Sequence, residues 1–81
     1  MVRLAAEIAD GAVWANAARS HMPKSLSYLG ARAAEPGFFT GNMISTCVDD
    51  DRAAAAAVMR KTLLGYVMLP NYQNYWIEAG Y

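Results

Sequence analysis

The sequence has little charge of either sign and no long charged stretch. Only 17% of its 81 residues are charged, seven basic and seven acidic side chains give a formal net charge of zero, and the longest basic run is Arg60-Lys61. A surface that follows a phosphate backbone needs clustered positive charge. Nucleic acid is therefore not an expected partner.

Cysteine is nearly absent, and so are long apolar runs. Cys47 is the only cysteine, so no intrachain disulfide can form and a disulfide-stapled secreted domain is excluded. The sequence also lacks an N-terminal basic segment followed by an apolar core, and no apolar run approaches the roughly 18–20 residues of a membrane span. We expect a soluble, cytoplasmic chain without a membrane partner.

Acidic residues cluster at only one place, Asp49-Asp50-Asp51, directly before an alanine-rich run. Carboxylates in this position are typical of helix capping and of compensation of the helix dipole. A metal site needs further oxygen ligands that converge on the same point, and none lies nearby in the sequence. No metal ligand is therefore assigned.

Apolar residues, in contrast, are in excess. They make up 56% of the chain, compared with roughly 45–50% in ordinary soluble domains. A chain this short buries only roughly 60–65% of the surface that its unfolded form exposes. Part of the apolar surface is thus expected to be covered by further chain or by a second copy, and we expect a homo-oligomer.

Periodicity and turn signals predict an α/β chain that forms a single domain over residues 1–81. A short amphipathic helix runs through Asp10-Gly11 into an apolar segment without polar alternation, as is typical of a strand buried on both faces. Pro23 fits the first turn of the next helix, and Glu35-Pro36-Gly37 is a break. Strand, helix and strand in this order imply a parallel pair with a right-handed crossover. The expected elements are helices at 1–9, 23–34, 50–69 and 71–79, strands at 12–17 and 43–48, and a loop or strand entry at 38–42.

Three passages carry a family resemblance: RLAAEIADGAVWANA, MISTCVDDDRAAAAAVMRKTL and GYVMLPNYQNYWIEAGY. In this order they resemble the luciferase-like family of flavin- or deazaflavin-dependent oxidoreductases and monooxygenases, whose fold is a (β/α)8 TIM barrel. The resemblance covers nearly the whole chain and is weakest over residues 31–39. A complete barrel needs about 250 residues. The resemblance therefore implies a barrel fragment with two short parallel strands and three to four helices, inactive or nearly so in isolation.

The resemblance also implies a cofactor, FMN or a deazaflavin in intact members of the family, and leaves open whether this chain alone binds one. Asn16, Ala17, Arg19 and Ser20 would correspond to a loop near the phosphate of the cofactor, with Arg19 as the cationic contact. A guanidinium can bind an oxyanion bidentately, and a solvated loop arginine is the alternative. No catalytic residue is assigned.

The other candidate residues are better explained by packing. His21 is the only histidine and the natural general acid or base, but no acidic residue stands at motif spacing to orient it. Cys47, near the end of the expected second strand, is expected to pack in the core. Aromatic residues at helical spacing are typical of packing or of a subunit interface, and for these we expect the interface. These are Tyr66, Tyr72, Tyr75 and Trp76.

Two functional hypotheses follow. In the first, the chain is part of a luciferase-like oxidoreductase whose redox chemistry belongs to the cofactor. In the second, it is a small structural or interaction protein without a cofactor, which covers its strand edges and aromatic tail by self-association. The two hypotheses agree on the α/β fold and differ in whether a flavin binds.

Overall fold

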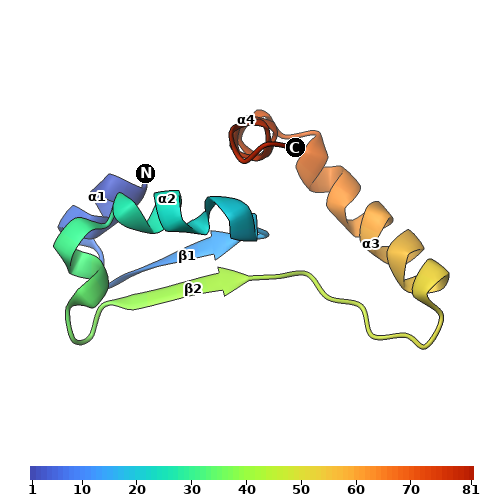
Figure 1. Ribbon diagram of the computed structural model, residues 1–81, viewed down its shortest axis with the longest axis horizontal. Helices are drawn as coiled ribbons and strands as arrows, with labels where there is room; N and C mark the ends of the chain where they lie inside the picture. Colours follow the sequence, from blue (N-terminus) through green and yellow to red (C-terminus); the bar gives the residue numbers. More distant parts are fainter. The chain divides into compact units, whose positions relative to one another are not determined.

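The computed structural model describes all residues, 1–81. It is a mixed α/β structure with four α-helices and two parallel strands, as the sequence predicts at this level (Figure 1). The chain divides into two compact units, Met1–Ile44 and Ser45–Tyr81.

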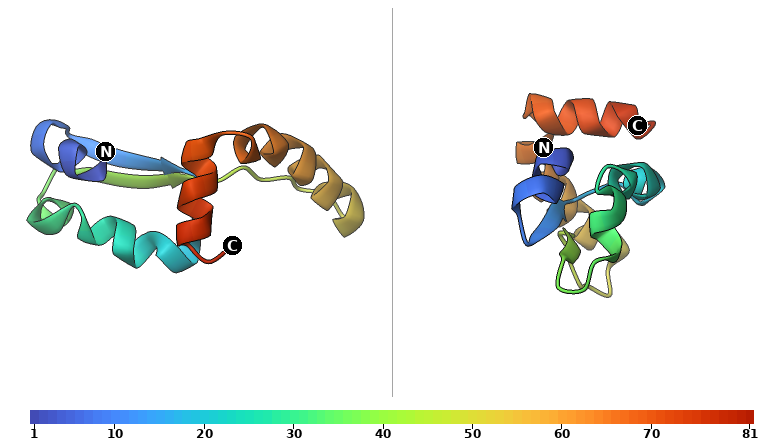
Figure 2. Two further views of the ribbon diagram at one scale, coloured as in Figure 1. Left: turned by 90° about the horizontal axis from the view of Figure 1, so that it is seen from above. Right: turned by 90° about the vertical axis from the view of Figure 1, so that its left-hand side faces the viewer.

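The first unit is a strand–helix–strand crossover preceded by a short helix. In chain order its elements are α1 (Val2–Ile8), β1 (Gly11–Ala15), the 3-10 helix η1 (Arg19–His21), α2 (Met22–Ser27), the 3-10 helix η2 (Gly30–Ala34) and β2 (Phe39–Met43). Both views of Figure 2 show α2 on one side of the strand pair. The crossover thus covers one face of the sheet.

The two strands pair in parallel over their full length, from Gly11 opposite Phe39 to Ala15 opposite Met43. The expected second strand at 43–48 is wrong in position, because β2 occupies the segment expected as a loop or strand entry. The ladder begins where the amide of Phe39 donates to the carbonyl of Asp10, at 3.0 Å. Pairing with β1 therefore fixes β2 directly after the break at 35–37, and residues 44–48 lie outside both strands.

The expected helix at 23–34 is also wrong as a single element. Pro23 lies in the first turn of α2 as predicted, but α2 ends at Ser27 and a separate 3-10 helix follows. Residues 28 and 29 form a turn between the two elements, and Gly30, the first residue of η2, has a φ of +58° in the left-handed region that interrupts a right-handed helix. The left-handed glycine therefore prevents one continuous helix over residues 23–34.

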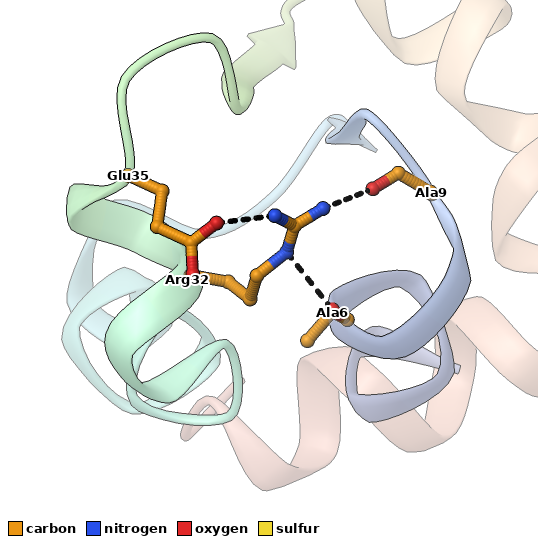
Figure 3. A network of polar contacts seen from close by, with 4 residues as sticks. All are labelled: Ala6, Ala9, Arg32 and Glu35. Carbon is orange, nitrogen blue, oxygen red and sulfur yellow. Dashed lines mark hydrogen bonds and ion pairs between the residues drawn. The ribbon is translucent and has the colours of Figure 1, made fainter.

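Helix α1 is anchored by a side chain from the crossover instead of by its own apolar residues. Leu4 and Ile8, whose spacing suggests an inward stripe, are exposed. The Arg32 guanidinium donates from Nε to the carbonyl of Ala6 at 3.0 Å and from Nη2 to the carbonyl of Ala9 at 2.8 Å (Figure 3). These are carbonyls that a helix C-terminus leaves without an intrahelical partner, so Arg32 caps α1.

Two further contacts hold Arg32 in place. Its Nη1 is paired with the Glu35 carboxylate three residues on, and its guanidinium lies 4.8 Å from the centre of the Phe38 ring. The planar guanidinium suits this arrangement because it bonds in its plane and stacks through its face. Residues 32–38 are thereby tied to the end of α1.

The second unit is a helical hairpin formed by α3 (Arg52–Val67) and α4 (Pro70–Glu78). Asp51 caps α3, since its Oδ1 accepts from the amides of Ala53 at 2.9 Å and Ala54 at 3.2 Å; this confirms the capping prediction. Pro70 lies at the start of α4, where a residue without an amide hydrogen is tolerated. The expected helices at 50–69 and 71–79 thus correspond to α3 and α4 with small shifts at their ends.

Aromatic side chains join the two helices of this hairpin. The Tyr66 and Tyr72 rings meet edge to face with their centroids 5.0 Å apart, and the Tyr72 and Trp76 rings are 5.6 Å apart. Such geometries are favourable for aromatic pairs. Three of the aromatic residues singled out in the sequence therefore pack against one another within the unit.

Very few side chains are buried. Leu29 is the only buried hydrophobic residue, and His21 and Ser25 are the buried polar ones. All three belong to the first unit, and no residue of the second unit is fully buried. No helix in the structure combines the length and the apolar character that crossing a membrane requires.

Candidate functional site

The candidate site is the loop that leaves the carboxyl end of β1, residues 16–20, here called the strand-end loop. Ligand sites of α/β folds gather at the carboxyl ends of parallel strands. The loop contains all four residues expected near a cofactor phosphate: Asn16, Ala17, Arg19 and Ser20. The structure therefore keeps them together at the end of one strand.

The loop begins with a sharp turn at Asn16. This residue has a φ of +52°, the only positive value outside glycine in the chain, in a region that asparagine tolerates better than most residues. Its amide donates to the carbonyl of Met43 at 2.7 Å. Asn16 thus extends the ladder by one bond and then turns the chain away from the sheet.

Asn42 on β2 holds the next residue of the loop. Its Oδ1 accepts from the amide of Ala17 at 3.2 Å and its Nδ2 donates to the carbonyl of Ala17 at 3.3 Å. One side-chain amide therefore satisfies both backbone groups of Ala17 across 25 residues of sequence. Sequence reasoning missed Asn42 because it placed residue 42 before the second strand, and only the strand register brings this side chain beside Ala17.

Arg19 and Ser20 are exposed at the start of η1, immediately after the part that Asn42 holds. A guanidinium and a hydroxyl next to each other are suitable donors for an oxyanion. The loop contains no carboxylate, imidazole or thiol. The side chains of Arg19 and Ser20 are therefore suited to binding an anion.

His21 follows the loop directly but lies in a different environment. It is buried at the junction of η1 and α2, one helical turn before the buried Ser25. A buried side chain at a helix junction has a packing role in the first instance.

The other candidate positions hold no site. Cys47 is half-buried in the segment between β2 and α3. No group of three or more histidine, cysteine, aspartate or glutamate side chains is arranged to hold a metal ion. The carboxylate of Asp49 instead accepts a hydrogen bond from the amide of Asp51 at 2.7 Å.

A shallow hollow opens at the start of the chain, lined by Met1, Val2, Arg3 and Tyr28. The guanidinium of Arg3 lies 5.3 Å from the centre of the Tyr28 ring, a cation–π distance. The hollow includes none of the strand-end loop. It adds no group to the candidate site.

Comparison with known proteins finds no relative: no family model matches the chain, and no curated protein or solved structure gives a significant match.

Proposed function

We propose that this chain is a section of a luciferase-like (β/α)8 barrel and that its strand-end loop contacts the phosphate of FMN or a deazaflavin. The observation that carries the proposal is the exposed Arg19 in a loop that Asn42 holds at the carboxyl end of a parallel strand. In barrels, this end of the strands forms the active site.

The uncovered face of the strand pair supports the barrel part of the proposal. Val13, Phe39 and Met43 are exposed there, although strands of parallel sheets are ordinarily covered on both faces. In a barrel such a face would pack against residues of the other strands. The proposal includes a cytoplasmic location, supported by the single cysteine.

The residues of the loop offer hydrogen-bond donors suited to a phosphate. Arg19, Ser20 and the backbone of the loop supply donors, while no aromatic or acidic residue of the loop could orient a flavin ring. When bound, the cofactor supplies the redox chemistry. The role of this chain is to hold its anionic end, and we expect no substantial turnover from two strands of an eight-stranded site.

Titration with FMN tests the proposal. We expect saturable binding of FMN by the full chain, measured by the fluorescence anisotropy of the flavin, competition by inorganic phosphate, and about tenfold or more weaker binding by Arg19→Ala, because a charged hydrogen bond contributes about 1.5–3 kcal/mol. Arg52→Ala is the matched control, since Arg52 is an exposed arginine at the start of α3. Circular dichroism establishes that both variants are folded.

Two outcomes of this titration would overturn the proposal. One is the absence of saturable binding to the folded chain. The other is an equal loss of affinity in Arg19→Ala and Arg52→Ala, which would assign the binding to general charge.

A second candidate function is a self-associating structural module without a cofactor. It is favoured by the small buried core, of which Leu29 is the only hydrophobic member. Its partner is another copy of the chain and not nucleic acid, because the chain carries no net charge. Light scattering of the purified chain distinguishes an oligomer from a monomer.

A further inference from the structure

The connection between α1 and β1 contains an aspartate followed directly by a glycine, Asp10-Gly11. Asp10 is exposed, and the chain bends at this residue. In such a pair the backbone nitrogen of the glycine can attack Cγ of the aspartate and close a five-membered succinimide ring. Glycine favours this reaction, because it has no Cβ to obstruct the approach and its backbone rotates freely. No other aspartate of the chain is followed by glycine.

The strand register leaves the attacking nitrogen of Gly11 outside the ladder. The carbonyl of Asp10 accepts from the amide of Phe39 at 3.0 Å, at the start of the strand pair. At its other end, the amide of Asn16 donates to the carbonyl of Met43 at 2.7 Å. Residues that bond to a parallel neighbour alternate with residues whose amides point away from it. The ladder bonds of β1 thus fall on even-numbered residues, and the amide of Gly11 points toward the edge of the two-stranded sheet.

Packing of the strands excludes the residues that would shield Asp10. A Cβ on Gly11 would lie 2.6 Å from the carbonyl oxygen of Phe39, so a larger side chain after Asp10 does not fit between the strands. The glycine that permits close pairing therefore also leaves the carboxyl group of Asp10 open to attack.

The other aspartates of the chain provide an internal comparison. Asp49, Asp50 and Asp51 are each followed by a residue with a long or charged side chain, the last of them by Arg52. The Asp51 carboxylate is also engaged as the cap of α3. Reactivity of a general kind would affect all four aspartates, whereas the geometry described above applies to Asp10 alone.

We propose that Asp10 is a site of spontaneous isomerisation to isoaspartate in the folded chain. In the first step the nitrogen of Gly11 bonds to Cγ of the Asp10 carboxylic acid, whose hydroxyl leaves with the nitrogen proton as water. In the second step water adds to the main-chain carbonyl carbon of Asp10, and the bond from this carbon to the Gly11 nitrogen breaks. The main chain then runs through Cβ and Cγ of residue 10, and the mass of the chain is unchanged. No reactant other than water is required.

Isomerisation would alter the group that starts the strand ladder. The carbonyl that accepts from the Phe39 amide becomes part of a carboxylate outside the main chain, and the main chain gains one carbon atom before Gly11. The carbonyl of the preceding residue, Ala9, accepts from Arg32 at 2.8 Å. The contacts that join α1 to the crossover and begin the sheet therefore lie next to the modified residue. This inference does not depend on the proposed cofactor.

Ageing of the full chain at neutral pH and physiological temperature tests the proposal. Trypsin separates residues 4–19, which contain Asp10, from residues 33–52, which contain the other aspartates. Isoaspartate in each peptide is measured with an isoaspartyl carboxyl methyltransferase as the reagent, and the succinimide is detected as a species lighter by one water. We expect isoaspartate to accumulate in the first peptide and not in the second.

Asp10→Glu is the matched control, because it keeps the charge at an exposed position while ring closure would require six members. Isoaspartate in the folded chain that is absent from Asp10→Glu supports the proposal. In the aged fraction we expect the Phe39 amide to exchange faster and the Ala55 amide, which donates to the Asp51 carbonyl in the second unit, to be unchanged.

Two outcomes would overturn the assignment. The first is a folded chain without isoaspartate at residue 10 beside a urea-unfolded chain that forms it, because the fold would then protect Asp10. The second is equal accumulation in the two peptides, because neither the glycine nor the strand edge would then direct the reaction.

Discussion

Gly11 shows how closely a single residue can control the strand pair. A Cβ at this position would lie 2.6 Å from the backbone carbonyl oxygen of Phe39 and 3.0 Å from its Cβ. Backbone atoms cannot rotate away, so an added methyl group would push β1 and β2 apart. Only glycine is compatible with this approach.

We therefore expect Gly11→Ala to lower the free energy of unfolding by about 1–3 kcal/mol, the usual effect of overpacking. Gly41→Ala is the matched control, because its methyl would meet the Phe39 ring, the movable end of an exposed side chain. Urea unfolding of both variants measures the difference. Equal losses would contradict the backbone explanation.

The position of the strand-end loop likewise depends on a single residue, Asn42. Asn42→Leu removes both bonds to Ala17, whereas Asn42→Asp retains an acceptor for the Ala17 amide and lacks the donor to its carbonyl. We expect hydrogen exchange of the Ala17 amide to be fastest in Asn42→Leu and intermediate in Asn42→Asp.

The same two variants connect the loop to the proposed ligand. Weaker FMN binding in the same order would follow if the loop positions Arg19. Unchanged exchange at Ala17 in Asn42→Leu would show that the loop is held by other contacts.

At the scale of elements, α3 has a defined start. Asp51 accepts from two amides of the first turn, and removing such a cap costs about 0.5–2 kcal/mol. We expect Asp51→Ala to reduce helicity at 222 nm and the free energy of unfolding by about 1 kcal/mol. Asp50→Ala removes the same charge from an exposed neighbour, and a comparable loss there would argue for charge instead of capping.

The elements differ in how far the sequence predicts them. The alanine run, the aspartates and Pro70 are local signals, and they locate α3 and α4 within about two residues. The position of β2 depends on pairing with residues about 28 positions earlier, which no local pattern contains. The short, weakly apolar segment Phe39–Met43 is a strand because β1 lies beside it.

The same distinction between local sequence signals and strand pairing applies to the candidate site. The end of an apolar run predicts where the strand-end loop begins, whereas the choice of its four residues as a site rests on the family resemblance. Asn42 could not, because its role depends on the register that brings it beside Ala17. The capping of α1 by Arg32 could not be predicted for the same reason, because Arg32 reaches the helix only through tertiary contacts.

At the scale of the whole molecule, a small core makes stability depend on association. If two copies fold together, mass action raises the midpoint of thermal unfolding with protein concentration. We expect about 4 °C for a tenfold increase, from the unfolding entropy of a dimer of this size. A midpoint independent of concentration would indicate that the chain unfolds as a monomer.

The guanidinium of Arg32 has a consequence for the order of folding. It bonds to the carbonyls of Ala6 and Ala9 across 26 and 23 residues of sequence, so these bonds form only after the crossover has closed. A helix of seven residues is marginal in water by itself. The first helix in the sequence is thus expected to be among the last to become stable, and its amides to exchange at the rate at which the crossover opens.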